Sequence, residues 1–163
     1  MLRRGLVVQS HPFNPAGKAI LIQHFDFIPE MATSVNKKAV GDFGETIALD
    51  IQRFLRDSGF RHPLVIAPGE PAKGDVLIKG TITRVHGGDA VAVQRKLVES
   101  FGFGDTEVKA AGEIIDLATS ISVMAFSFTK QSRYTWVENE EAVRENLREI
   151  AREISTTLIQ MQR

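Results

Sequence analysis

The chain has 163 residues, so one domain over residues 1–163 is the default, and a chain of this length can fold without a metal or a disulfide. Lysine plus arginine and aspartate plus glutamate are equal at 20 each, which leaves no net positive field to attract nucleic acid or an acidic membrane. The absence of cysteine excludes disulfides, thiol catalysis and thiolate metal sites.

The amino terminus begins like an export signal but does not continue as one. Met1–Val8 carries two arginines and a short apolar run that stops at Gln9, short of the roughly 7–15 apolar residues that an export signal uses. We therefore predict no export signal in this chain: either the protein is not exported, or its natural chain starts at another residue. Residues 1–18 also hold two prolines and are predicted to form an irregular lead-in to a core over residues 19–163.

A strand, a helix and a second strand are predicted next. Ala19–Phe27 is apolar on both sides at its start, which indicates a central strand covered on both faces. Apolar residues then recur at helical spacing and predict a helix over residues 38–58. Leu64–Ala67 is predicted to be a short strand.

Glycines mark both ends of this predicted helix. Gly41 and Gly44 either weaken its first turns or permit close packing on the sheet. Gly59 lies where a left-handed C-terminal cap belongs, and Phe60 can pack back on the last turn.

Three strand patterns separated by tight breaks follow, and they predict an antiparallel meander. Asp75–His86 is rich in β-branched residues and ends at two glycines. In the second strand, apolar and small residues alternate with charged ones from Glu107 to Ile114. The third strand, Ile121–Thr129, has two alternating sets, which are Ile121, Val123 and Ala125 on one side and Ser122, Met124 and Phe126 on the other.

A second helix is predicted at the carboxyl terminus. Asn139 can cap it, and two glutamates follow in the first turn, where negative charge is favourable. Its apolar stripe consists of Val143, Leu147, Ile150, Ile154, Leu158 and Met161. The fold class is therefore predicted as α+β: strand–helix–strand, a three-stranded antiparallel meander and a C-terminal helix, with two helices on one face of a mixed sheet.

The glycine-rich segment Phe101, Gly102, Phe103 and Gly104 suggests a phosphate loop at first sight. A dinucleotide fingerprint needs a third glycine at position 107, at the start of a helix, but Glu107 and a strand pattern follow. We therefore interpret the segment as a hairpin. With its phenylalanines exposed, it would form an apolar loop for binding a partner.

His24 and Asp26 are two residues apart on one predicted strand and would share a face as base and orienter, or as metal ligands. Arg95, near the glycine loop, is a further candidate for holding an anionic ligand. A third metal ligand cannot be identified, and the sequence has no Gly-x-Ser-x-Gly elbow. We predict no catalytic residue, no cofactor and no metal site.

The meander and the end of the preceding helix carry a recognisable pattern of glycine, strand and acidic positions. These positions are Phe54–Phe60, Gly74–Val85, Gly87, Gly88, Arg95, Gly102–Gly104, Val108 and Ile114–Asp116. Within residues 19–130 the pattern resembles a family of bacterial envelope proteins of unknown function, many of them predicted lipoproteins. More distantly, the chain is similar to the amino-terminal domain of TolB and to the curli secretion lipoprotein.

The resemblance implies the fold and a periplasmic or outer-membrane location, but it offers no catalytic residues to carry over. The chain departs from the family in lacking an export signal and a lipid-bearing cysteine, so membrane attachment would need a lipid anchor that is absent from this chain. It also has Thr119-Ser120 where the family commonly has a glycine after the threonine.

Two functions are consistent with these observations. The first is a non-catalytic interaction or assembly module of the envelope, which binds a protein partner or further copies of itself, as exposed sheet edges would allow. The alternative is a cytosolic enzyme or small-ligand-binding protein that uses His24 and Asp26. Nucleic-acid binding ranks last, because the charge is balanced and aromatic residues make up only 7%.

Overall fold

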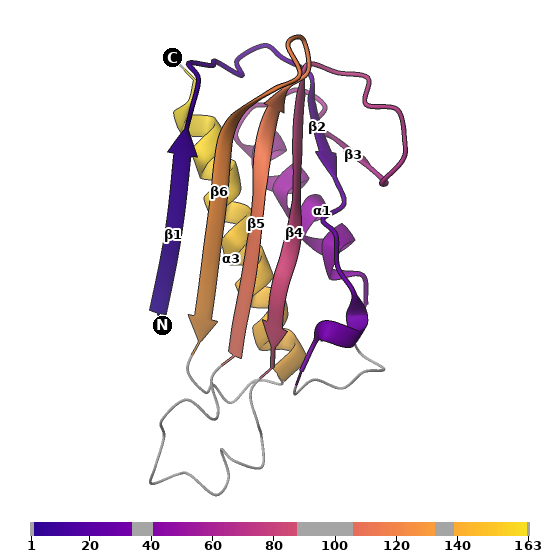
Figure 1. The fold of residues 1–163 in the computed structure, drawn as a ribbon, viewed down its shortest axis with the longest axis vertical. Coiled ribbons are helices and arrows are strands. Elements are labelled where there is room, and N and C mark those ends of the chain that lie inside the picture. The colour runs from indigo at the N-terminus through magenta and orange to yellow at the C-terminus, as the bar shows by residue number, and fades with distance from the viewer. Residues whose placement is uncertain (1, 34–40, 88–105, 133–138, 163) are drawn as a thin grey trace, which may run out of the picture.

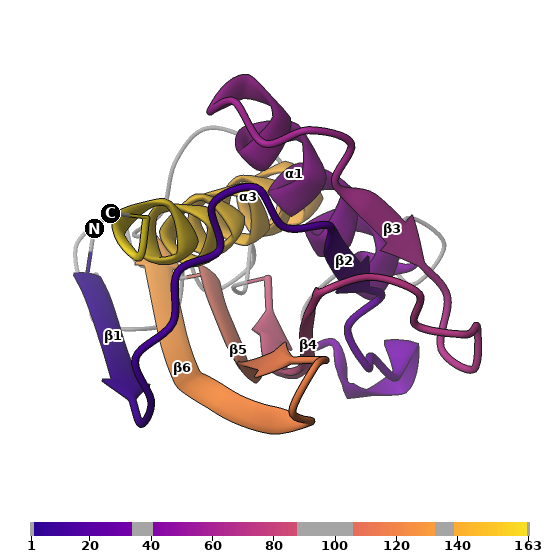
Figure 2. The same ribbon diagram turned by 90° about the horizontal axis from the view of Figure 1, so that it is seen from above.

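Two α-helices cover one face of a six-stranded mixed sheet in the computed structural model, which describes residues 2–33, 41–87, 106–132 and 139–162 (Figures 1 and 2). This is the α+β arrangement predicted from the sequence. In chain order the elements are β1 (Leu2–Gln9), β2 (Ile20–Gln23), the 3-10 helix η1 (Pro29–Met31), α1 (Phe43–Asp57), β3 (Leu64–Ile66), β4 (Val76–His86), β5 (Thr106–Asp116), β6 (Ile121–Ser132) and α3 (Asn139–Gln160).

The strands follow the order β1-β6-β5-β4-β2-β3 across the sheet. β4, β5 and β6 pair antiparallel in succession, which confirms the meander, whereas β2 pairs parallel with both β3 and β4. The connection from β2 to β3 runs through α1, as a parallel pair requires. The strand–helix–strand unit and the meander are thus two halves of one sheet.

The prediction of an irregular lead-in over residues 1–18 is wrong for its first half. Leu2–Gln9 forms β1, which pairs antiparallel with β6 from Leu2↔Gln131 to Gln9↔Met124. This strand depends on an edge supplied by the far end of the sequence, so two arginines and a glycine do not prevent it. Gly5 has a steric role there, because a Cβ at this position would lie 2.7 Å from the Phe128 ring.

The core lies between the sheet and the two helices. The predicted stripe of α3 is confirmed, since Val143, Leu147, Ile150, Ile154, Leu158 and Met161 are all buried. α3 packs mainly on β5 and β6, and α1 packs on β2, β3 and β4. The helical layer therefore covers the strands from β3 to β6, while β1 lies at the margin of the sheet (Figure 2).

α1 begins at Phe43, later than the predicted start at residue 38. Asp42 is its N-cap, and the side-chain carboxylate accepts a hydrogen bond from the Glu45 N–H at 3.1 Å. The other end is as predicted: Gly59 has φ +95°, and Phe60 is buried and donates its N–H to the Leu55 carbonyl at 3.1 Å.

The third strand of the meander does not alternate as one continuous set. Its pairing with β5 shifts between Ile114 and Ile115, which leaves an extra residue in β6 at Val123. Beyond this bulge, Met124 and Phe126 are buried and Ala125 is exposed. Phe126 packs against Phe128, with ring centroids 5.9 Å apart.

The Asn146 side chain joins α3 to the ends of two strands. Its Nδ2 donates to Thr106 Oγ1 at 3.1 Å, and its Oδ1 accepts from Ser132 Oγ at 2.7 Å. All three side chains are buried, and every buried side-chain nitrogen and oxygen among the described residues has a partner. This cluster orients α3 on the sheet and has no polar group left for a ligand.

Gly44 sets how closely α1 approaches the chain that follows β2. A Cβ at Gly44 would overlap the Phe25 carbonyl oxygen. The Phe25 N–H in turn donates to the Gly44 carbonyl at 3.2 Å. Of the two roles that the sequence allows for Gly44, close packing is therefore the one in the structure. Gly41 lies before the helix, and among the described residues only the Arg144 guanidinium would come within 4 Å of a Cβ there, at 3.9 Å.

We expect Gly44→Ala to destabilise the protein, although alanine is the better helix former. The clash with backbone forces α1 away from β2, at a cost of about 1–3 kcal/mol or more. Gly41→Ala is the matched control and should change the free energy of unfolding by less than about 0.5 kcal/mol. Denaturant unfolding of both variants checks this, and equal stability of the two would contradict the close approach.

Asp50 carries a largely buried carboxylate on α1. Burial raises its pKa above the ordinary value of 3.8, and the positive charges of Arg53 and Arg148 offset this only in part. Arg53 Nη2 lies 3.0 Å from Asp50 Oδ1 within α1, and Arg148 belongs to α3. Because the folded state binds this proton more readily than the unfolded state, the ionised carboxylate lowers stability at neutral pH.

We expect Asp50→Asn to benefit the free energy of unfolding more at neutral pH than at acid pH. The wild-type protein should gain stability relative to the variant as the pH falls through the raised pKa toward 3.8, because Asp50 then becomes neutral. Thermal unfolding of both proteins over this pH range measures the difference. A stability difference between the two proteins that stays constant with pH would show that burial does not raise the pKa of Asp50.

Candidate functional site

The residues predicted to bind a partner or ligand are only partly placed by the structure. Phe101–Gly104 and Arg95 lie outside the described residues, so their roles stay predictions. His24 and Asp26 lie beyond the end of β2 at Gln23, not within a longer strand. Their backbone groups extend the sheet: the His24 N–H donates to Ile66 at 3.0 Å, and the Asp26 N–H donates to Gly80 at 2.9 Å.

The structure brings His24 together with Asp42 and Glu45 rather than with Asp26. One potential metal-ligand atom from each of these three side chains lies within 4.8 Å of the others. Asp42 already caps α1, however, and the positive end of a helix dipole disfavours a bound cation. Asp42 and Glu45 are exposed. Helix capping therefore explains this group, and the spacing Asp42-x-x-Glu45 is its signal in the sequence.

The surface that stands out is the free edge of the sheet at β1. Among the described strands β1 pairs only with β6, and its outer side is open (Figure 1). Leu6, Val7 and Val8 are 63%, 40% and 52% exposed. A long edge strand with exposed apolar side chains is a template for pairing with another chain. Sequence reasoning missed this surface, although the run Leu6-Val7-Val8 was its visible signal.

The two faces of β1 differ in their surroundings. Val7 pairs with Phe126, whose ring is buried under the helices, so Val7 faces the helical layer. Leu6 and Val8 point to the opposite face, where their partners Ser127 and Ala125 are also exposed.

The phase of the β1–β6 hydrogen bonds shows which backbone groups of β1 are free. The Ser10 N–H donates to the Val123 carbonyl at 2.9 Å, directly across the continued register. Hydrogen-bonded pairs alternate along an antiparallel ladder, so Val8 bonds to β6, whereas Gly5, Val7 and Gln9 direct their N–H and C=O groups outward.

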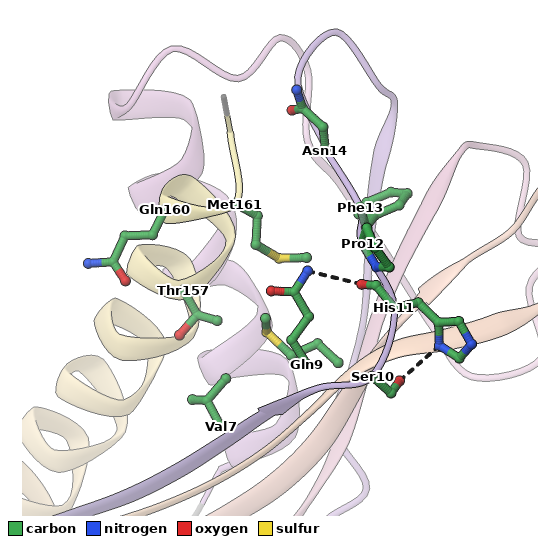
Figure 3. A pocket seen from close by; sticks show the side chains of 11 residues that line it. Val7, Gln9, Ser10, His11, Pro12, Phe13, Asn14, Thr157, Gln160 and Met161 are labelled. Atoms are coloured by element: carbon green, nitrogen blue, oxygen red, sulfur yellow. Dashed lines mark hydrogen bonds between the residues drawn. The ribbon is translucent and has the colours of Figure 1, made fainter.

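A groove of about 810 Å³ lies beside this edge, between the end of β1 and the last turns of α3 (Figure 3). Val7, Met124 and Met161 contribute apolar side chains to it, and Gln9 and Gln160 contribute polar ones. The groove exists because the sheet ends at β1, so no further strand covers the side of α3. It does not include His24.

Ser10 and His11 lie together at the rim of the groove, but their hydrogen bonds do not form a nucleophile–base pair. Ser10 Oγ donates its proton to the Ser122 carbonyl at 2.9 Å. Ser10 Oγ also lies 3.0 Å from His11 Nδ1, and must therefore accept the proton of that nitrogen. A serine that is hydrogen-bonded in this way is not activated for attack.

Comparison with known proteins shows the fold. No family model and no curated protein matches the sequence. The PelC dodecamer from Paraburkholderia phytofirmans in space group P6 matches with a TM-score of 0.58 and 12% identity, over 94% of this chain and 98% of that chain. A point variant of the PelC dodecamer in space group C2 matches with a TM-score of 0.57 and 11% identity, with the same coverage. Protein XCC0632 from Xanthomonas campestris, of family DUF330, matches with a TM-score of 0.60 and 10% identity, over 90% and 89% of the two chains.

These identities are low, so the likeness establishes the architecture alone. It extends over nearly the whole chain and agrees with the fold expected from the family resemblance. The expected similarity to TolB and to the curli secretion lipoprotein stays a prediction. Among the described residues, no helix is long and apolar enough to cross a membrane.

The free backbone groups of β1 lead to a test by proline substitution. We expect Val7→Pro to leave the fold intact, because the outward N–H at this position has no partner in β6. Val8→Pro should cost roughly 1–3 kcal/mol, because it leaves a carbonyl of β6 without its donor. Denaturant unfolding compares the two variants. A larger loss of stability for Val7→Pro than for Val8→Pro would show that Val7, and not Val8, is hydrogen-bonded to β6.

Proposed function

We propose that this protein is a non-catalytic, envelope-associated module that works by assembling with further copies of itself. The observation that carries the proposal is the edge of β1, with three exposed apolar side chains, backbone groups that have no partner among the described residues, and an adjoining groove. Such an edge is normally blunted in a monomeric protein by charge, proline or shortness. Pairing with a second chain would satisfy its backbone and cover its apolar side chains.

The structural neighbours support self-association. PelC from Paraburkholderia phytofirmans is a dodecamer, and it shares this fold over 94% of the present chain. Its likeness does not identify the contacts, because an identity of 12% leaves the surfaces free to differ. The envelope part of the proposal rests on the resemblance of residues 19–130 to a family of envelope proteins.

The alternative, a ligand-binding protein or enzyme that uses His24 and Asp26, has less support. The Asp26 backbone is bound into the sheet by two hydrogen bonds, from its N–H to Gly80 and from the Ile82 N–H to its carbonyl, each 2.9 Å long. His24 lies beside a helix cap instead of in the groove beside β1. Ser10 and His11 are arranged without an activated nucleophile.

One experiment tests both parts of the proposal. Cells that express the chain from its own locus, with the upstream region intact, are fractionated, and the protein in each fraction is sized by sedimentation. We expect recovery with the periplasm or the envelope membranes, as an assembly larger than the 18.0 kDa monomer.

The two readouts can fail separately. Recovery from the cytosol would overturn the envelope location, and a monomer at every concentration up to the high micromolar range would overturn self-association. The double variant Leu6→Lys, Val8→Lys should reduce the mass of the assembly, because charges on an edge strand oppose pairing. Ile28→Lys is the matched control, since Ile28 is equally exposed but lies outside β1.

A further inference from the structure

We propose that β1 pairs antiparallel with β1 of a second copy of this chain, about a two-fold axis that passes through Val7. The two sheets would then form one continuous sheet across both copies. This inference rests on the proposed self-association and adds the surface, the orientation and the register of the contact.

The backbone of β1 restricts which registers are possible. Gly5, Val7 and Gln9 direct their N–H and C=O groups outward, and only outward groups of two chains can bond to each other. In a two-fold antiparallel pair, odd-numbered residues must therefore lie opposite odd-numbered residues. The axis then passes through a residue, not between two residues.

The side chains select among these registers. An axis through Val7 places Val7 opposite its own copy and Leu6 opposite Val8 of the second copy, so apolar residues meet on both faces. An axis through Gly5 would place Arg4 opposite Leu6, and an axis through Leu6 would place Arg4 opposite Val8. An axis through Val8 would place Val7 opposite Gln9. The register centred on Val7 is the one that matches all three exposed apolar residues and leaves both arginines beyond the paired segment.

The helices leave room for this contact. A two-fold axis perpendicular to the sheet puts both α3 helices on the same face, each over its own β5 and β6. Strands are about 4.8 Å apart, so the two β6 strands would be separated by about 14 Å, more than the roughly 8–10 Å at which helices pack. The Val7 pair would lie between the two helices, beside Met124 and Met161 in the groove of each copy.

The opposite edge of the sheet is less suited to the same role. β3 has only three residues, and Pro63, which has no N–H, comes directly before it. A head-to-tail contact of β1 with β3 would therefore pair a short segment and leave much of β1 open. β1 contains no proline and can pair along its apolar half with an identical edge.

Cysteine cross-linking tests the register directly, because the chain has no cysteine of its own. Val7→Cys should form disulfide-linked dimers under mild oxidation, since an opposed pair has a Cα–Cα distance of about 5.5 Å, within the range of a disulfide. Leu6→Cys and Val8→Cys should each cross-link poorly alone, because like residues are then diagonal neighbours roughly 7–8 Å apart. A mixture of the Leu6→Cys and Val8→Cys proteins should form a disulfide-linked heterodimer, because these two positions lie opposite each other in the proposed register.

Ile28→Cys and Leu64→Cys serve as controls for random collision and for the β3 edge; both positions are more than half exposed. We expect Val7→Cys to cross-link roughly tenfold faster than either, because pairing raises the effective concentration of the thiols. Equal rates at Val7 and Ile28, or a dominant cross-link through Leu64, would overturn the proposal. Efficient cross-linking of Leu6→Cys alone would also overturn the proposal, because the two-fold axis would then pass through Leu6 instead of Val7.

Sedimentation of the same proteins separates this inference from the function on which it rests. An assembly that forms without the Val7 cross-link would retain self-association and reject the β1 register, whereas a monomeric protein would reject both. The mixed Leu6→Cys and Val8→Cys sample keeps the test valid if Val7→Cys folds poorly. Val7→Pro, which removes an outward N–H, should also weaken assembly several-fold.

Discussion

The pairing of β1 on one side only is the constraint from which the candidate surface follows. Two helices pack over the strands from β3 to β6, and a sixth strand extends the sheet beyond them. The exposed run Leu6–Val8 and the groove beside α3 are therefore two results of one cause. An element that paired with the edge would lie beside the groove, so one partner can contact both features.

An edge of this kind carries a risk as well as a use. Unpaired backbone groups beside exposed apolar side chains promote unspecific association, which natural sheets oppose with charges or proline. Here the protection is uneven along β1. Arg3 and Arg4 precede the apolar run, and like charges repel when identical strands align over them. The arrangement leaves one half of the strand open to a partner and discourages pairing along the other half.

The parts of the fold that were predictable from the sequence are those in which local pattern and burial agree. The stripe of α3 and the glycine cap of α1 depend on neighbours a few residues away. The apolar spacing places the start of α1 too early, whereas the Asp42-x-x-Glu45 spacing marks the cap at which the helix begins. β1 and the face reversal at Val123 depend on pairing between distant strands, which no local window contains. The candidate surface was missed for the same reason, since it is defined by where the sheet ends.

The polar groups of the structure argue for recognition by shape and backbone rather than by chemistry. Asp42 is committed to a helix cap, and the proton of Ser10 to a carbonyl of the neighbouring strand. The cluster around Asn146 satisfies its own members inside the fold. The β1 edge, by contrast, offers an apolar run with alternating outward donors and acceptors. Such a surface fits an extended strand closely, and in the proposed register that strand is β1 of a second copy.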